Sequence, residues 1–321
     1  MGRQKRNRRD VDGVILVNKP IGMSSNGVLQ KVKWLFHANK AGHTGALDPL
    51  ATGVLPICLG ESTKFSQFLL DSNKAYITTA KLGERTASCD AESEVTETKP
   101  VPELNLEHIN ELIKQNLMGE ITQIPPIYSA LKVGGIPMYK LARQGIPVEV
   151  KSRQVRITMC KVLDIRVDKN EIDLEVHCSK GTYIRSIVDE FGQLLGCGAH
   201  VTMLHRTQHG FYDIADSISL DELIEIQEAN QADTKEDPKQ YIKLDELLLS
   251  ADSPVQDLDK VELTPAQVTT ILSGQFVQLD KPLGFYRLFD QASNRFLGLG
   301  EITQKHGLKP HRIIREPQAY S

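Results

Sequence analysis

The stretch GHTGALDPLATG, residues 42–53, holds a single carboxylate, Asp48, among glycines, small residues and one proline. Three glycines and Pro49 favour a fixed irregular loop over a helix or a regular strand. The apolar run VLPICL, residues 54–59, follows at once and predicts a strand that anchors the loop. Asp48 could therefore be a nucleophile or a base on a rigid loop. It could equally be a turn residue whose carboxylate accepts hydrogen bonds from its own backbone.

Three further segments accompany this stretch: VNKPIGMSS at residues 17–25, IPPIYSALK at 124–132 and GTYIRS at 181–186. Together with residues 42–56 they resemble, in content and order, the motifs of the TruB family, the bacterial tRNA pseudouridine-55 synthases. The likeness extends over residues 13–210. It implies an enzyme that isomerises one uridine in the T-loop of tRNA to pseudouridine.

The chain is expected to have an α+β fold, with a mixed, largely antiparallel central sheet flanked by helices (the pseudouridine synthase fold). The apolar patterns predict strands near 13–17, 54–59, 75–82, 155–159, 172–178 and 200–204, and helices after Ser24 or Ser25, from Thr63, over 109–117 and 184–194, and after Ser219. Residues 84–105 are polar and predict a loop. The resemblance implies a catalytic domain over 13–250 and, over 251–321, a small C-terminal β-barrel similar to a PUA-like RNA-binding domain.

Residues 121–150 combine several prolines, a Gly-Gly pair, two tyrosines and several basic residues. A long, proline-stiffened, basic and aromatic segment inside a compact domain favours a binding loop over a plain connection. Tyrosines offer stacking to RNA bases, and Lys and Arg offer contacts to phosphates. We therefore expect an RNA-binding insertion here, with an ordinary surface loop as the alternative.

The composition is that of a globular protein, with 25% charged and 40% hydrophobic residues. The net charge of −3 is uneven, because residues 216–262 carry 14 acidic and 4 basic residues while both flanking parts are basic. This pattern is compatible with a polyanion bound on one face, although a solvated acidic surface is the commoner explanation.

The five cysteines have no CxxC spacing, so reduced thiols are expected. Apart from the single HxxxH spacing of His205 and His209, the nine histidines show no ligand pattern, so we expect no metal site. No apolar run approaches the roughly 18 residues of a membrane span, and the N-terminus lacks the apolar core of a signal peptide. The expected localisation is cytoplasmic.

The resemblance makes Asp48 the catalytic residue. An enclosed apolar pocket would neutralise a carboxylate, so a cation must hold it ionised. By the resemblance that cation is Arg185, through a bidentate salt bridge, whereas the sequence alone gives only a helical arginine. Tyr76 should stack on the flipped uracil, and its alternative is a core or edge tyrosine.

Tyr183 and Leu204 should, by the same resemblance, line the pocket for the base. His43 should enter the RNA loop and fill the space left by the extruded nucleotide. Lys19 and Pro20 should brace the pocket without touching the substrate. Without the resemblance, core packing or a structural role would explain each of these residues.

Two segments depart from the family pattern. The family usually shows two arginines where this chain has His205 and Arg206, which puts one phosphate or structural contact in doubt. Residues 86–93, TASCDAES, match the family only at Thr86, Asp90 and Glu92, so a role for Asp90 has weak support.

Pseudouridine formation involves no redox change and no net hydrolysis, so we expect neither a cofactor nor a metal. The expected partner is the T-arm stem-loop of tRNA, bound by a monomer without an obligatory protein partner. One alternative is a tRNA-binding or tRNA-folding module in which catalysis is secondary or absent. Another is a guide-RNA-dependent relative that acts with protein partners, against which the insertion at 121–150 argues.

Residues 3–9 contain five Lys and Arg, and no apolar residue occurs between Gly2 and Val11, so residues 1–12 predict a disordered basic arm. Deleting residues 2–9 is expected to weaken tRNA binding mainly at low salt, because phosphate contacts release counterions. The measurement is the slope of log Kd against log salt concentration for the full chain and the deletion. An unchanged slope would contradict a phosphate-binding arm.

Overall fold

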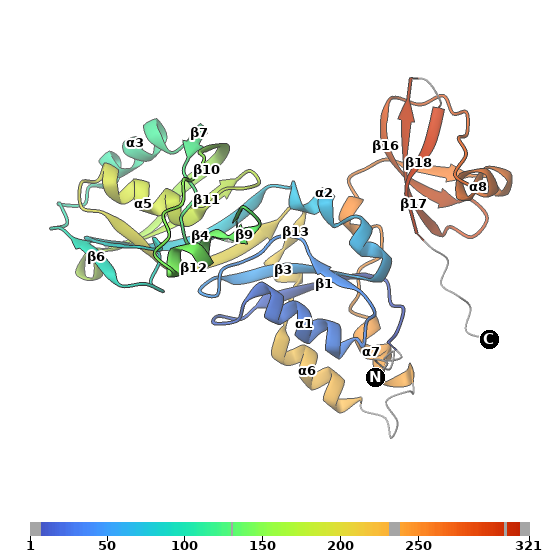
Figure 1. Cartoon of the computed structure of the whole chain (residues 1–321), viewed down its shortest axis with the longest axis horizontal. Helices are drawn as coiled ribbons and strands as arrows, with labels where there is room; N and C mark the ends of the chain where they lie inside the picture. The colour runs from blue at the N-terminus through green and yellow to red at the C-terminus, as the bar shows by residue number, and fades with distance from the viewer. Residues whose placement is uncertain (1–7, 130, 231–237, 305–306, 315–321) are drawn as a thin grey trace.

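The structure is a computed structural model that describes residues 8–129, 131–230, 238–304 and 307–314. Its larger part is a ten-stranded sheet with helices packed on it, and a separate four-stranded sheet follows near the C-terminus (Figure 1). The expected α+β class, with a mixed and largely antiparallel central sheet, is confirmed.

The strands of the central sheet are β1 (Gly13–Lys19), β2 (Ala41–His43), β3 (Thr52–Leu59), β4 (Lys74–Leu82), β7 (Gly119–Gln123), β10 (Arg153–Arg166), β11 (Glu171–Cys178), β12 (Ala199–His209), β13 (Tyr212–Asp213) and β14 (Ile218–Ser219). Their order is β14-β1-β3-β12-β4-β11-β10-β7, with β2 paired to β3 and β13 to β12. The alternation seen in the sequence explains the buried strands. In β11, for example, every second residue from Ile172 to Cys178 is buried, as a strand with one face on the core requires.

The helices are α1 (Ser25–Leu35), α2 (Ser66–Leu70), α3 (Leu106–Asn116), α4 (Met138–Arg143), α5 (Ile184–Leu194), α6 (Leu220–Ala229), α7 (Ile242–Asp245) and α8 (Pro265–Leu272). Ser24 starts α1 because its hydroxyl accepts the Gly27 N–H at 3.0 Å. Ser219 starts α6 with a complete capping box. In Figure 1, α3 and α5 cover one end of the sheet, while α1, α6 and α7 cover the other.

Strand β12 joins the half of the sheet that α3 and α5 cover to the half that α1, α6 and α7 cover. It pairs with β4 along most of its length, but it pairs with β3 at only two positions, His205 with Thr52 and Arg206 with Gly53. The loop that carries Asp48 ends where β3 begins, so this loop opens at the seam between the halves.

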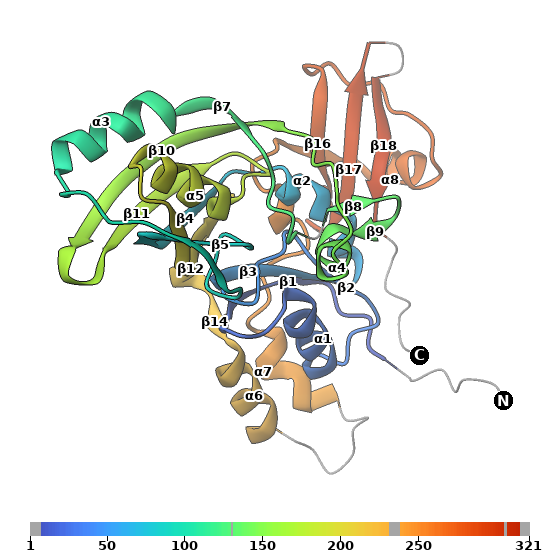
Figure 2. The same ribbon diagram turned by 60° about the vertical axis from the view of Figure 1, so that its left-hand side comes forward.

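Two expected loops contain regular structure. Residues 84–105 include the hairpin of β5 (Glu84–Thr86) and β6 (Val95–Thr98), so the expectation of a plain loop is wrong there. The sequence did not predict this hairpin because β6 is largely exposed and has no apolar alternation. Within the insertion at 121–150, β8 (Lys132–Val133) and β9 (Ile136–Pro137) pair and lead into α4 (Figure 2).

The start of the chain corrects the expected arm. Arg9 forms an ion pair with Asp245 of α7 and lies over the ring of Tyr241, with 4.2 Å from its guanidinium carbon to the ring centroid. Its backbone also bonds to His37 and Asn39. Residue 9 thus belongs to the folded part, while residues 1–7 of the expected arm lie outside the described residues. A deletion that tests the arm alone should end at residue 7.

The C-terminal sheet has the strands β15 (Lys260–Leu263), β16 (Gly284–Asp290), β17 (Phe296–Thr303) and β18 (Gly307–Ile313), in that order. A bridge between Val277 and Leu308 extends it. Aromatic contacts hold it against the segment before β4: the ring centroids of Phe65 and Phe296 lie 5.3 Å apart, and those of Phe68 and Phe285 5.8 Å apart. None of the helices in the described parts of the chain is both long and apolar enough to span a membrane.

Gly53 lies where β3 pairs with β12, and its backbone geometry requires glycine. Its φ is +109°, and a Cβ at this position would lie 2.2 Å from the carbonyl oxygen of Arg206. Gly53→Ala is therefore expected to lower the free energy of unfolding by about 2 to 3 kcal/mol or more. Gly22→Ala, where φ is +81° and no atom lies within 4 Å, is the matched control and should cost only about 1 kcal/mol of backbone strain. Equal losses for the two variants in denaturant titrations would contradict the steric argument.

Candidate active site

Hydrogen bonds from the connection between β1 and α1, and from the first residue of α1, fix the Asp48 loop. The Ser25 hydroxyl accepts the Leu47 N–H at 2.7 Å and lies 2.9 Å from the Leu47 carbonyl oxygen. The carbonyl of Pro49 accepts the Gly22 N–H at 2.8 Å. These bonds fix the backbone on both sides of Asp48, so its carboxylate has a defined position.

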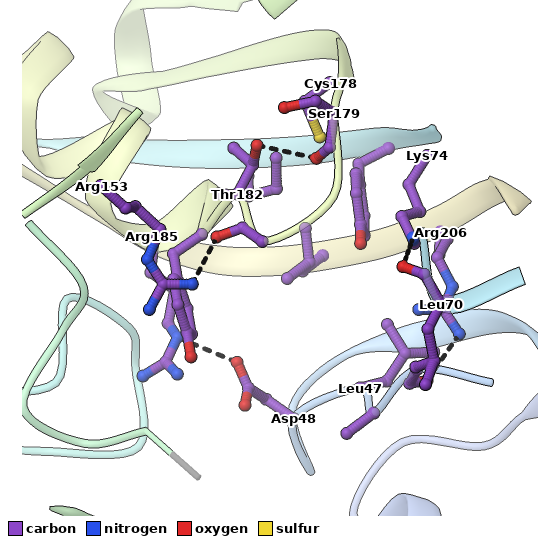
Figure 3. A pocket seen from close by; sticks show the side chains of 17 residues that line it. Leu47, Asp48, Leu70, Lys74, Arg153, Cys178, Ser179, Thr182, Arg185 and Arg206 are labelled. Carbon is purple, nitrogen blue, oxygen red and sulfur yellow. Dashed lines mark hydrogen bonds and ion pairs between the residues drawn. The ribbon is translucent and has the colours of Figure 1, made fainter. Parts of the chain in front are cut away.

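Asp48 faces Arg185, which lies in the first turn of α5. Arg185 Nε lies 2.9 Å from Asp48 Oδ2, and the Arg185 side chain is only 4% exposed (Figure 3). The side chain of Asp48 keeps 38% of its surface exposed, and Asp48 lines the pocket described below. Of this pair, the carboxylate is the group that a bound molecule can reach.

Arg185 is shared between two carboxylates. Its NH1 nitrogen lies 3.1 Å from Oδ2 of Asp90, whose side chain is 1% exposed. NH1 also donates to the carbonyl of Ser88, and NH2 donates to the carbonyl of Tyr128, both at 3.0 Å. The expected bidentate pair with Asp48 is thus replaced by a network that ties the 86–92 segment and the base of the insertion to the Asp48 loop.

Asp90 is more important to this geometry than its weak sequence support indicated. The Glu92 N–H donates to its carboxylate at 3.0 Å, and the Thr86 hydroxyl donates to its carbonyl at 2.7 Å. These are the three positions of residues 86–93 that match the family pattern. The signal was present in the sequence, but nothing in it placed Asp90 beside Arg185.

The pKa values follow from this arrangement. Burial raises the pKa of the Asp48 carboxyl above its ordinary value of 3.8, Arg185 and Lys19 lower it, and Asp90 adds to the rise. Burial also lowers the pKa of Lys19 to about 8, against the attraction of Asp48. The guanidinium is therefore the main group that favours the ionised form of Asp48.

A pocket of about 270 Å³ opens above Asp48 and Arg185 (Figure 3). The predicted residues Tyr76, Tyr183 and Leu204 line it together with these two. Tyr76 and Leu204 are 8% and 6% exposed, whereas Tyr183 is half-buried with the Arg153 guanidinium 5.2 Å from its ring centroid. The volume lies just below the usual range for pockets of drug-sized ligands, which suits a single nucleoside-sized group.

The other predicted residues lie outside the pocket lining. Lys19 is fully buried and donates to the carbonyls of Pro20 at 2.8 Å and Pro49 at 3.3 Å, so it braces the loop from behind. His43 ends β2 and is half-buried. Burial and the charge of Arg206 lower the pKa of His43, which keeps its ring neutral at pH 7.

Three further cations line the pocket: Lys74 and Arg153, which the sequence did not single out, and Arg206, which it singled out only as part of a departure from the family pattern. Burial, reinforced by the charge of Arg206, lowers the pKa of Lys74 to about 8. A single basic residue in a strand is usually solvated, so the pattern alone gave no reason to place these residues in a pocket. Among the described residues, no group of three or more His, Cys, Asp or Glu could hold a metal ion.

Known protein families account for nearly the whole chain. The TruB family pseudouridylate synthase N-terminal domain matches residues 33–184. The tRNA pseudouridylate synthase B C-terminal domain matches residues 185–256, and the pseudouridine synthase II TruB C-terminal domain matches 260–314. The tRNA pseudouridine synthase B of Yersinia pestis (strain Pestoides F) is 47% identical over 319 residues, which cover 98% of this chain and 96% of that protein. The chain belongs to the TruB family.

Other relatives and solved structures agree. The tRNA pseudouridine synthase B of Vibrio parahaemolyticus serotype O3:K6 is 49% identical over 313 residues, covering 97% of this TruB chain and 98% of that protein. A chain of an H/ACA RNP bound to a substrate RNA containing 2′-deoxyuridine superposes with a TM-score of 0.68 at 22% identity, covering 96% of this chain and 86% of that one. A chain of a Cbf5-Nop10-Gar1 complex gives 0.67 at 23% identity, with coverages of 94% and 84%. At these identities the solved structures support the fold alone.

The two neighbours of the TruB Asp48 carboxylate should shift its titration in opposite directions. Ionised Asp48 is lost as pH falls through its pKa, and we expect this loss to set the acid limb of kcat/KM. Arg185→Gln removes a cation that lowers this pKa, so the limb should move to higher pH. Asp90→Asn removes an anion that raises it, so the limb should move to lower pH.

The measurement is kcat/KM against pH for wild type and both variants. Arg85→Gln is the matched control, because Arg85 also pairs with two carboxylates, Asp189 and Glu97, but does not line the pocket. Its limb should coincide with that of wild type. Shifts of the Arg185 and Asp90 variants in the same direction would contradict the assignment.

Proposed function

We propose that this chain isomerises the uridine at position 55 in the T-loop of tRNA to pseudouridine, with the base turned out into the pocket beside Asp48. The observation that carries the proposal is the Asp48–Arg185 ion pair in the pocket wall, which offers an ionised carboxylate to a nucleoside-sized ligand. Relatives of 47% and 49% identity over nearly the full chain are tRNA pseudouridine synthase B, which supports the same substrate class.

The chemistry requires little beyond such a carboxylate. The N1–C1′ bond breaks, a C5–C1′ bond forms, C5 loses a proton and N1 gains one, so no oxidant or net hydrolysis is involved. Asp48 can attack C6 of the ring or C1′ of the sugar, or it can remove a sugar proton toward a glycal. Because the atoms balance without a further reactant, the proposal includes neither a cofactor nor a metal.

The other pocket residues position the base. We assign Tyr76 to stacking on the uracil, and Tyr183 and Leu204 to the remaining walls of the base pocket. Extruding a nucleotide costs a few kcal/mol and is cheapest where it is already unpaired, which suits an RNA loop. His43, beside the pocket at the end of β2, is assigned to the space that the extruded nucleotide leaves.

Binding of the RNA backbone is assigned to basic groups outside the Asp48–Arg185 pair. Lys74 and Arg153 at the pocket wall, the insertion at 121–150 and the C-terminal PUA-like sheet are the surfaces that we propose for the T-arm. The division at residues 13–250 and 251–321, a cytoplasmic location, and action as a monomer without a protein partner belong to the same proposal. The insertion supports self-sufficient target choice.

A tRNA-binding or tRNA-folding module without catalysis is the alternative. A chain under no demand for catalysis has no reason to retain an ion pair as closely organised as Asp48, Arg185 and Asp90, because burying charged groups costs free energy. Assistance in tRNA folding can accompany catalysis, because a protein that opens the RNA loop to extrude a nucleotide also allows the loop to fold again after release.

Release of tritium from C5-labelled uridine in an unmodified tRNA transcript tests the proposal. Wild type should release tritium with chelator present and no added cofactor, because C5–H is lost in every turnover. Asp48→Asn should bind the tRNA and release none. The released fraction should map to position 55 when the product RNA is digested and the nucleosides are separated.

Each other outcome has a definite meaning. If wild type binds tRNA and releases no tritium, the non-catalytic alternative replaces the proposal. If Asp48→Asn releases tritium at the wild-type rate, the assignment of Asp48 is wrong. Pseudouridine at another position would overturn the T-loop assignment while leaving the chemistry intact.

A further inference from the structure

Among the residues that the structure describes, Arg206 is the largest side chain that is almost completely buried, with 1% of its surface exposed. It lies on β12 next to Leu204, and its side chain reaches the pocket lining. Figure 3 places it near Lys74, on the side of the pocket away from Arg185. The family pattern has an arginine at this position with no defined task beyond a phosphate or structural contact, and the catalytic chemistry described above does not use it.

Its guanidinium joins the two ends of the catalytic loop. Nε donates to the carbonyl of Val54 at 2.8 Å, and NH2 donates to the carbonyl of Gly45 at 3.2 Å. These two carbonyls stand on either side of residues 46–53, the segment that carries Asp48. One planar, rigid group therefore sets the width of the loop at its base.

The same guanidinium holds Tyr76. Arg206 and Tyr76 are directly paired residues of β12 and β4. Burial is the largest cause of a pKa of about 12 for Tyr76, and the nearby charge of Arg206 opposes this rise. The tyrosine assigned to base stacking and the loop assigned to catalysis thus have one common support.

No carboxylate among the described residues forms an ion pair with Arg206. A buried guanidinium without a counter-ion costs free energy that packing alone does not return. Its charge contributes to lowering the pKa of several neighbours, among them Lys74, to about 8, and His209, to about 2, in both cases after burial as the larger cause. A methionine of similar length would fill the space without a buried charge, but it would leave the carbonyls of Val54 and Gly45 without these hydrogen bonds, so the arginine is suited to positioning the loop.

We propose that Arg206 is a positioning residue that clamps both ends of the Asp48 loop and fixes the ring of Tyr76, so that carboxylate and base meet in a reactive geometry. The inference rests on the proposed isomerase function. It requires no contact between Arg206 and the RNA, because only 1% of the surface of this side chain is exposed even though it reaches the pocket lining. Its loss should therefore slow the chemical step and leave RNA affinity nearly unchanged.

The test compares wild type with Arg206→Met and Arg206→Lys. Single-turnover tritium release and the Kd for the same tRNA transcript are measured separately, well below the thermal midpoint of each variant. Displacement of a catalytic group by about 1 Å can cost a hundred-fold in rate. Arg206→Met is therefore expected to lose roughly that factor in rate with little change in Kd. Arg206→Lys keeps the charge but cannot reach both carbonyls, so its rate should lie between the two.

Arg166→Met is the matched control. Arg166 is also a multidentate arginine of the central sheet, bonded to Glu171 and Asp173, and it does not line the pocket. Its rate should equal that of wild type even if its melting temperature falls. If Arg206→Met does not fold, Arg206→Lys decides the question.

A wild-type rate in the folded Arg206 variants would overturn the clamp, as would a loss that appears only in Kd. A loss of rate in Arg166→Met equal to that in Arg206→Met would also overturn it, because general destabilisation would then explain both. If wild type itself releases no tritium, the proposed function fails instead, so the two failures are distinguishable.

Discussion

A carboxylate drawn into an enclosed pocket becomes neutral unless a cation lies beside it. In this protein that cation is Arg185, whose Nε lies 2.9 Å from Asp48. Arg185 is itself buried, so it needs more than one partner, and Asp90 with two backbone carbonyls supplies the rest. The two carboxylates and one guanidinium sum to a single negative charge. Because Asp90 and Arg185 are covered, that charge is available only at Asp48, which faces the pocket.

The fold assembles this unit through one strand. Near its start, β12 forms two backbone hydrogen bonds with the segment that contains Asp90. The Ala91 N–H donates to the Val201 carbonyl at 2.9 Å, and the Val201 N–H donates to the Cys89 carbonyl at 3.1 Å. Farther along, the same strand meets the Asp48 loop at Gly53 and places Leu204 in the pocket. The position of Asp90 relative to Asp48 is therefore set by the length of β12. A shift in its register would separate the two carboxylates and turn Leu204 away from the pocket.

Local sequence patterns were enough to predict individual strands and the starts of helices. Alternation in β11, the cap at Ser24 and the capping box at Ser219 are short-range signals, and the structure confirms each of them. The exposed strand β6 has no such pattern, because its residues pack on no core. The site divides in the same way. Asp48 was predicted from the sequence of its loop. The position of Asp90 depends on pairing with β12, and that of Arg206 on the pairing of β12 with β3 and β4, neither of which a local pattern specifies.

The local distribution of charge, rather than the net charge of the chain, decides where a polyanion is attracted. The chain as a whole is acidic, yet the pocket wall combines four basic residues, Lys74, Arg153, Arg185 and Arg206, with Asp48. None of the described residues within 216–262, which hold the acidic surplus, lines the pocket, and the helices α6 and α7 of this segment pack with α1 and β1. A polyanion is attracted by the field where it docks and repelled elsewhere. An acidic segment outside the pocket thus favours approach of the RNA to the basic side and disfavours binding in other orientations, so a net negative charge is consistent with an RNA substrate.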